Sequence, residues 1–255
     1  MCDIPIINID DNYIVRDKST SDGSQIKYNY ENKWYKIDNF GGEGEAECLA
    51  SLDLECSGLP LEDFVLYDKM MINGSLGCVS DEFRRDTENE SFISFYRLYK
   101  NINGRDLAEV TSRMDYDDAI SYVIDFIQKS VGLDVHEYLA NTLFLDEIIL
   151  NTDRHFNNYG IIMNKDSYRT APIFDNGKSL LVGCEYNPEL NSIADSVKQV
   201  YSKTFSADFG FNSRYLKKYR TMQLDFEILY SRLKDYPDSI QKKALMYQLN
   251  KIESR

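Results

Sequence analysis

A nearly apolar helix that leads directly into a polar run is the feature that most constrains this chain. Residues Val135 to Leu150 have helical periodicity, and their apolar side chains cover one broad face. A helix of this composition has to be buried in the core of a domain. The chain then continues into the polar run Asn151–Asn158. We therefore expect this polar loop to be presented from a buried and fixed support.

The first third of the chain predicts strands and turns, followed by a helix. β-favouring residues occupy Tyr13 to Val15, Gln25 to Tyr30 and Lys33 to Asp38, with turn-forming residues between them. A helix is predicted from Glu43 to Cys56, because Ala and Leu recur at helical spacing before a Gly-Leu-Pro stop. The apolar segment Phe64 to Tyr67 predicts a buried strand.

The remainder of the chain predicts mostly helices. Periodicity is helical from about Asp106 onward, and two short strands follow the polar run. The predicted elements are helices at Tyr116 to Ser130, near Met222 to Leu233 and near Ser239 to Ile252, and strands at Tyr159 to Met163 and Tyr168 to Phe174. We expect an α+β fold of two lobes, a β-rich lobe over residues 1–75 and a helical lobe over residues 76–255.

Composition restricts the location and the partners of the chain. Of its 255 residues 43% are hydrophobic, which is enough for a sizeable core, and the formal charge of −13 argues against direct nucleic-acid binding. No apolar run approaches the ~18 residues that span a bilayer, and the first residues lack the pattern of a secretory signal. The five scattered cysteines suggest reduced thiols. We therefore expect a cytoplasmic protein without a membrane partner.

Three polar residues have the types and the order that phosphoryl transfer requires. Asp153 and Asn158 are five residues apart, and Asp175 follows 22 residues after Asp153. One carboxylate orients the attacking hydroxyl and accepts its proton, while an amide oxygen and a second carboxylate hold magnesium against the phosphates. Magnesium prefers hard oxygen ligands and takes only a few of them from the protein. For either run alone, an ordinary helix exit or a turn is the alternative interpretation.

The runs Asn151–Asn158 and Ala171–Gly177, separated by a predicted hairpin, together resemble the catalytic and metal-binding loops of HipA-like serine/threonine kinases. The Asp-Arg-His-x-x-Asn core is also similar to that of phosphatidylinositol kinases, to which the HipA-like family is related in fold. The resemblance implies a bilobal, protein-kinase-like fold that uses ATP and Mg²⁺. Asp153 is then the catalytic base, and Asn158 and Asp175 are the magnesium ligands.

The resemblance also implies a phosphate loop near the beginning of the chain. The segment Ser21 to Lys27 stands where the family has a glycine-containing loop. This assigns Gly23, Ser24, Gln25 and Lys27 to phosphate binding, through backbone N–H groups and the lysine charge. An ordinary hairpin turn is the alternative interpretation of this segment.

A lysine and a glutamate of the first lobe complete the implied nucleotide site. Lys36 resembles the kinase strand lysine that contacts the α- and β-phosphates, and Lys33 is the second candidate for this role. Glu47 resembles the helix glutamate that pairs with that lysine, and Glu43 and Glu45 compete with it. For each of these charged residues, a solvated side chain is the alternative interpretation.

Three further assignments follow from the same resemblance. Phe64 to Tyr67 would form the hinge, so Val65 and Tyr67 are assigned to adenine binding through their backbone; a plain core strand is the alternative. His155 is expected to orient the catalytic loop, and a histidine at this place is also able to carry protons. Arg154 is expected either to hold a loop or to neutralise phosphate.

The sequence therefore predicts an ATP- and Mg²⁺-dependent kinase that phosphorylates a Ser or Thr hydroxyl of a protein. The family resemblance further implies an antitoxin or other regulator as a partner, and autophosphorylation within Ser19–Ser24. A small-molecule or lipid kinase and a nucleotide-binding pseudokinase that serves as an interaction module are the alternatives. HipA-like toxins are considerably longer and carry an additional amino-terminal subdomain, so the acceptor stays open.

Overall fold

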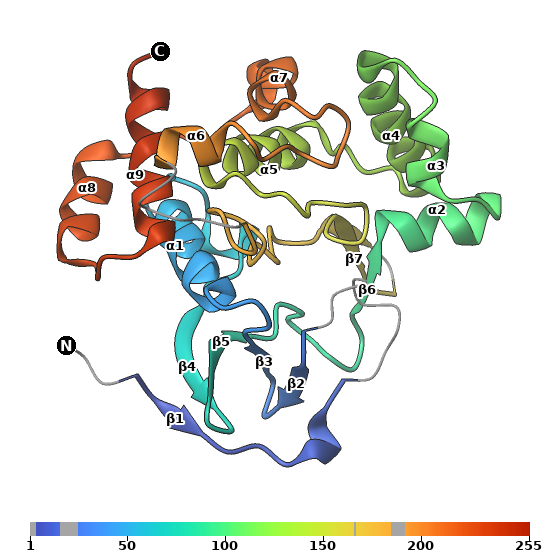
Figure 1. Cartoon of the computed structure of the whole chain (residues 1–255). Coiled ribbons are helices and arrows are strands. Elements are labelled where there is room, and N and C mark those ends of the chain that lie inside the picture. Colours follow the sequence, from blue (N-terminus) through green and yellow to red (C-terminus); the bar gives the residue numbers. More distant parts are fainter. Residues whose placement is uncertain (1–3, 16–24, 166, 185–191) are drawn as a thin grey trace.

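The computed structural model describes residues 4–15, 25–165, 167–184 and 192–255, which form a sheet-rich part and a helical part (Figure 1). Five strands make one sheet in the order β1-β4-β5-β3-β2. In chain order they are β1 Ile6–Ile7, β2 Lys27–Tyr30, β3 Lys33–Ile37, β4 Asp68–Ile72 and β5 Ser75–Asp81. Neighbouring strands are antiparallel except β1 and β4, which run parallel.

The hairpin of β2 and β3 fixes which side chains face the rest of the molecule. Its two turn residues, Glu31 and Asn32, have φ values of 51° and 58°, as expected for a two-residue turn whose twist matches the strands. Adjacent residues of a strand point to opposite faces. Tyr35 therefore joins a small apolar cluster on one face of the sheet, whereas Lys36, paired in register with Cys78, points to the other face.

Helix α1 (Glu43–Glu55) lies between the sheet and the other helices (Figure 1). It packs on β4 and β5 on one side and on the last helix on the other. Its start approaches the sheet closely, since a Cβ atom on Gly44 would lie 2.6 Å from the Gly77 carbonyl oxygen. Its apolar residues, such as Leu49 and Leu54, are fully buried in the main core. This packing fixes the distance between α1 and the sheet that contains β3.

The helical part surrounds α5 (His136–Ile149), which is buried along nearly its whole length as predicted. The other helices are α2 Phe95–Asn103, α3 Leu107–Thr111, α4 Tyr116–Val131, α6 Ile193–Val197, α7 Phe209–Tyr215, α8 Phe226–Asp235 and α9 Ile240–Glu253. A second sheet contains β6 Ser91–Ser94, β7 Gly160–Met163 and β8 Tyr168–Thr170 in that order. The 3-10 turns are η1 Asp11–Tyr13, η2 Leu61–Asp63 and η3 Lys217–Tyr219. None of the helices formed by the described residues has the length and the apolar character needed to cross a membrane.

Two of the predicted strands were wrong. The segment at Tyr13 to Val15 is the end of η1 followed by a single bridge from Ile14 to Tyr28. The segment Phe64 to Tyr67 is buried except for Leu66, and it forms only one bridge, between Phe64 and Ile173. Its backbone is held instead by bonds to two other elements, as described below, so it does not enter a sheet.

The predicted division of the chain after residue 75 falls at the beginning of β5. Because β5 pairs with both β3 and β4, the first sheet continues to Asp81. Only two residues, Asn73 and Gly74, separate β4 from β5, too few for a lobe boundary. We therefore propose to draw the division between two lobes after Asp81.

Asp53 provides a test of how α1 is packed. It is fully buried, and neither of its carboxylate oxygens has a hydrogen-bond partner within the described chain. Burial raises the pKa of this carboxyl well above its ordinary value. In the unfolded chain the group ionises near pH 3.9. The contribution of this group to stability is therefore fully present below that pH. It falls as the pH rises toward the folded pKa, because ionisation then favours the unfolded state.

Asp53→Asn should remove this penalty, because the amide is neutral at every pH. We expect the variant to have the larger free energy of unfolding at pH 8, because the raised pKa of the buried Asp53 carboxyl costs the wild-type protein stability there and the amide has no such cost. The difference should shrink toward pH 4. Urea denaturation at several pH values measures it, and a difference that is independent of pH would contradict the buried, protonated carboxyl.

Candidate functional site

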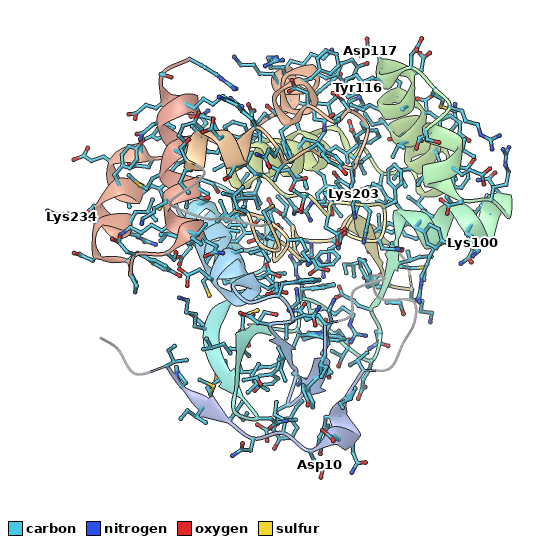
Figure 2. All side chains as sticks on the ribbon, in the orientation of Figure 1. Asp10, Lys100, Tyr116, Asp117, Lys203 and Lys234 are labelled. Atoms are coloured by element: carbon cyan, nitrogen blue, oxygen red, sulfur yellow. The ribbon has the colours of Figure 1, made fainter. Side chains whose placement is uncertain are left out.

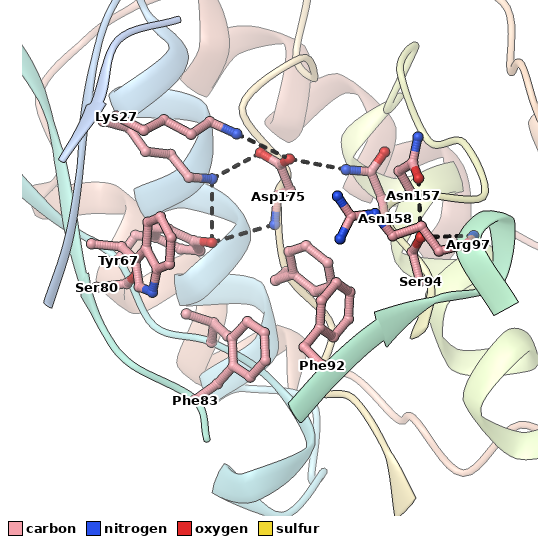
Figure 3. Close-up of a pocket in the computed structure, with 14 residues that line it drawn as sticks. Lys27, Tyr67, Ser80, Phe83, Phe92, Ser94, Arg97, Asn157, Asn158 and Asp175 are labelled. Carbon is pink, nitrogen blue, oxygen red and sulfur yellow. Dashed lines mark hydrogen bonds and ion pairs between the residues drawn. The ribbon is translucent and has the colours of Figure 1, made fainter. Parts of the chain in front are cut away.

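One lysine on the first sheet joins α1 to the second polar run. The Nζ atom of Lys36 lies 2.7 Å from Glu47 Oε1 and 2.8 Å from Asp175 Oδ1, and its side chain is almost completely buried. A second lysine, Lys27 on β2, approaches the other carboxylate oxygen of Asp175 at 3.7 Å. Figure 3 shows the contacts of the two lysines with Asp175 as dashed lines. The sequence-predicted residues Lys27, Lys36, Glu47 and Asp175 thus meet in one cluster.

The charges of this cluster are mutually dependent. Burial by itself would raise the pKa of Asp175, but the charges of Lys27 and Lys36 outweigh it and hold that pKa far below its usual range. Burial would lower the pKa of Lys36, but the carboxylates of Asp175 and Glu47 outweigh it and raise that pKa well above its usual value. The lysine is therefore charged and Asp175 is ionised. An anionic ligand that binds here would contact the ammonium group of Lys36, which is charged before the ligand arrives.

The backbone turn at Asp175 is fixed by groups from three elements. Asp175 has a φ of 61°, which is uncommon for a residue with a side chain. The N–H of Asn176 donates to Glu47 Oε2 at 2.8 Å, and the N–H of Asp175 donates to the Tyr67 hydroxyl at 3.3 Å. Lys36 Nζ also lies 4.7 Å from the centre of the Tyr67 ring. Tyr67 therefore supports the turn through its side chain.

The first polar run begins where α5 ends in a left-handed residue, Leu150, with a φ of 54°. Thr152 ties this run to the second one, because its N–H and its hydroxyl both donate to the Lys178 carbonyl oxygen at 3.0 Å. The Asp153 N–H donates to Asn151 Oδ1 at 3.0 Å, and the Asp153 carboxylate stays about one-third exposed. The proposed base is therefore held by its backbone while its carboxylate remains accessible.

Asn158 and His155 form the remaining part of the predicted set. Asn158 Nδ2 donates to Asp175 Oδ2 at 2.9 Å, and Asn158 Oδ1 accepts from the backbone N–H of His155 at 3.2 Å. The two proposed metal ligands are thus adjacent. His155 Nδ1 is buried and has no hydrogen-bond partner in the described chain. The backbone N–H of His155 thus orients the side chain of Asn158, whatever the role of the His155 ring.

The buried side chain of Arg154 connects the two polar runs. Its side chain is fully buried, and the guanidinium donates to both oxygens of Asp146 at 2.9 to 3.1 Å. It also donates to the Phe174 carbonyl oxygen at 2.7 Å and to Asn176 Oδ1 at 2.6 Å. Of the two roles left open by the sequence, this geometry supports the structural one. Asp146 was missed, although a carboxylate within the apolar α5 helix was a signal of a buried ionic partner.

A pocket adjoins Asp175 at the junction of the two sheets (Figure 3). Its walls are mostly apolar and aromatic, with a few polar groups at one end, as in sites that bind flat heterocycles. The apolar lining comes from Trp34, Val65, Tyr67, Phe83, Phe92 and Phe174, and the polar lining includes Lys27, Lys36, Ser94, Arg97, Asn157 and Asn158. Sequence reasoning had identified only part of this lining. The lining residues on β6, and Phe83 shortly after β5, carry no motif.

A second, smaller hollow shares Lys27, Asn158 and Asp175 with this pocket. It is also lined by Gln25, Asp153, Gly177 and Lys178. The hollow holds two lysines and the three carboxylates Glu43, Asp153 and Asp175, so an aromatic slot is followed by a space with charges of both signs. Lys178 was not singled out by the sequence.

The structure separates the competing candidates. Lys33 pairs with Asp81 on the exposed side of the sheet, and Glu45 pairs with Lys69. Glu43 Oε1 accepts the N–H groups of Asn39 and Phe40 at the start of α1. Lys36 and Glu47 are thus the pair at the site. Gly23 and Ser24, and the hydroxyls at positions 19–21, lie outside the described residues.

The backbone N–H groups of Val65 and Tyr67, which were assigned to adenine binding, already have partners within the protein. The N–H of Val65 donates to the Ile173 carbonyl oxygen, and the N–H of Tyr67 donates to Ser51 Oγ, both at 2.9 Å. These donors are therefore not available to adenine. Both side chains nevertheless line the pocket, so a contact with the nucleotide through side chains stays a prediction.

No family model and no curated protein matches the chain. Among solved structures, the proinflammatory kinase CtkA of Helicobacter pylori superimposes with a TM-score of 0.66 at 16% sequence identity, covering 98% of this chain and 94% of CtkA. The chain has the fold of this kinase. The HipA toxin of Shewanella oneidensis MR-1, solved with HipB and operator DNA, gives a TM-score of 0.44 at 10% identity over 89% of this chain and 63% of that chain.

The fold similarity to CtkA confirms the predicted α+β, kinase-like architecture. It also agrees with the kinase resemblance that the two polar runs predicted, as a likeness of fold. At these identities the comparison does not assign a substrate. The chemistry must be argued from the residues of the site itself.

Proposed function

We propose that this chain is an ATP- and Mg²⁺-dependent kinase that transfers the γ-phosphoryl group to a protein Ser or Thr hydroxyl. The observation that carries this proposal is the chain of contacts from Glu47 through Lys36 and Asp175 to Asn158. It joins a sheet lysine, a helix glutamate and both polar runs beside a pocket of suitable shape. A nucleotide-binding scaffold without catalysis would not require the accessible Asp153 carboxylate at the same hollow.

The residues at the site fit a magnesium ion. Within the described ranges no group of three or more His, Cys, Asp and Glu side chains forms a metal site. A kinase magnesium needs fewer, because phosphates and waters supply its other ligands. Asp175 offers a carboxylate and Asn158 offers an amide oxygen. A rotation of the Asn158 amide about its terminal torsion would place Oδ1, in place of Nδ2, on the side that faces Asp175. The ion would then screen charge on the phosphates.

The roles of the protein groups follow from their chemistry. The Lys36 ammonium binds phosphate oxygens, and the aromatic pocket takes the adenine. The Asp153 carboxylate orients the acceptor hydroxyl and takes up its proton as the new oxygen–phosphorus bond forms. The acceptor class, an antitoxin or regulator as partner and a cytoplasmic location stay predictions. The first two follow from the sequence resemblance, and the location follows from composition and the pattern of the first residues.

Transfer of label from γ-labelled ATP in the presence of Mg²⁺ tests the proposal. We expect the wild-type protein to label a protein acceptor on Ser or Thr, and Asp153→Asn to reduce the rate by about 100-fold or more, because a general base contributes roughly 10²–10⁴. Nucleotide binding should persist in the variant, as read from the fluorescence of the single tryptophan, Trp34, in the pocket wall. Equal labelling by both proteins would refute the assigned base. Label on a metabolite would favour a small-molecule kinase.

A further inference from the structure

A lysine from outside both polar runs lies at the proposed base. Lys203 Nζ forms an ion pair with Asp153 Oδ1, although the two residues are 50 positions apart in the chain. Both side chains remain partly exposed, at 54% and 34%. In Figure 2 Lys203 lies near the middle of the molecule, whereas the labelled Lys100 and Lys234 stand at its edges. A ligand can therefore reach this ion pair.

The segment that carries Lys203 has a fixed conformation. Asn212 on α7 is buried, and its Nδ2 donates to Ser202 Oγ, to the Thr204 carbonyl oxygen and to the Ser206 carbonyl oxygen at 2.9 to 3.1 Å. Its Oδ1 accepts from the Ser206 N–H at 3.0 Å. One buried amide thus makes four hydrogen bonds to both sides of Lys203. A lysine that merely solvates the surface does not need such support.

The same segment is also attached to the catalytic loop itself. The Thr204 hydroxyl donates to the carbonyl oxygen of Arg154, the residue next to Asp153. The Phe205 ring packs edge-to-face against Phe156 at 5.7 Å between ring centres. Phe205 has a φ of 61°, a backbone conformation that surrounding contacts must maintain. The position of Lys203 relative to Asp153 is therefore set from two directions.

Lys203 brings a further positive charge to Asp153 at the small hollow, whose lining holds carboxylates as well as lysines. Lys178 lines that hollow with Asp153, and its Nζ lies 3.2 Å from the centre of the Phe40 ring. Burial lowers the pKa of Lys178, while Glu43 and Asp153 act in the opposite direction. Asp153 thus has cationic neighbours from two separate segments. Charge that develops on a transferred phosphoryl group would be stabilised there by preorganised cations.

We propose that Lys203 is a positioning residue for phosphoryl transfer: it holds the Asp153 carboxylate toward the acceptor and, with Lys178, places positive charge beside the moving phosphoryl group. This inference rests on the proposed kinase function and adds a residue to it. In the step, the bond from the γ-phosphorus to the leaving oxygen of ADP breaks and a bond to the acceptor oxygen forms. The hydroxyl proton passes to Asp153, and Lys203 keeps its proton throughout.

The test compares Lys203→Met and Lys203→Arg with Lys198→Met. Lys198 is the matched control, because it is an exposed lysine five residues before Lys203 that pairs with Asp195 at 3.5 Å and lines neither the aromatic pocket nor the small hollow. We expect Lys203→Met to lower kcat for phosphoryl transfer by about 10- to 100-fold, the scale for losing one preorganised charged contact. ATP affinity, followed by Trp34 fluorescence, should stay within about twofold of the wild-type value. The arginine variant should recover most of the rate, and Lys198→Met should not differ from wild type.

A second variant separates positioning from folding. Thr204→Val keeps the shape of the side chain but removes its bond to the Arg154 carbonyl oxygen. We expect a smaller fall in kcat, again with unchanged ATP affinity. A Lys203→Met kcat within twofold of wild type, or above it, would overturn the inference, as would failure of arginine to restore the rate. If the wild-type protein itself transfers no phosphoryl group, the proposed kinase function fails first.

Discussion

Replacing Asp175 with asparagine should abolish Mg²⁺-dependent phosphoryl transfer, with a rate loss of about three orders of magnitude or more. The carboxylate serves two purposes in the proposed site: it is the charged ligand of the metal, and it neutralises Lys27 and Lys36. Metal stabilisation of the phosphates is worth several kcal/mol, and about 1.4 kcal/mol corresponds to a factor of ten. The substitution keeps the shape of the side chain, so the loss should come from charge.

The control for this variant is Asp81→Asn. Asp81 also pairs with a lysine, Lys33, but both side chains are exposed, at 80% and 46%. Exposed pairs of this kind contribute at most about 1 kcal/mol to stability, and this one is far from the polar runs in the chain. Initial rates at saturating ATP, measured over a range of Mg²⁺ concentrations, provide the comparison. A rate for Asp175→Asn near that of the control would exclude Asp175 as the metal ligand.

The residue types that carry chemistry were predictable because their spacing is local. Asp153 and Asn158 share one loop, and Asp175 follows a short hairpin, so the sequence already implied that they could meet. The preference for Lys36 and Glu47 came from the family resemblance. It left Lys33, Glu43 and Glu45 as competitors, and only the folded chain shows which lysine and glutamate meet. The structure brings these residues to one place.

What the sequence did not predict depends on contacts between distant segments. Nothing near Lys203 in the chain indicates that its loop reaches Asp153, because the buried amide of Asn212 sets that position. The strand predicted at Phe64 to Tyr67 was wrong because an apolar segment looks the same in a sheet and beside one. Its true partners, Ser51 and Ile173, could be found only in three dimensions.

Arg154 illustrates the same limit and leads to the second large effect. We expect Arg154→Met to lower the free energy of unfolding by about 3–5 kcal/mol, the usual result of leaving one partner of a buried ion pair without its counterion. Asp146 would remain in the core, where burial already raises the pKa of its carboxyl despite the opposing charge of Arg154. Chemical denaturation measures the change. Arg232→Met is the matched control, because Arg232 forms an exposed pair with Glu55 at the same 2.9 Å distance and should change stability by less than about 1 kcal/mol.

A double variant distinguishes the effect of the unpaired Asp146 charge on stability from the effect of the Arg154 hydrogen bonds on the site. Replacing both Asp146 and Arg154 with leucine removes the unpaired charge, so much of the lost stability should return, as for buried pairs exchanged for apolar residues. Phosphoryl transfer should not return, because the guanidinium also binds the Phe174 carbonyl oxygen and Asn176 Oδ1 and thereby sets the turn at Asp175. A double variant with restored stability and restored transfer would show that Arg154 contributes only to folding. If the single variant is no less stable than Arg232→Met, the buried pair does not support the fold.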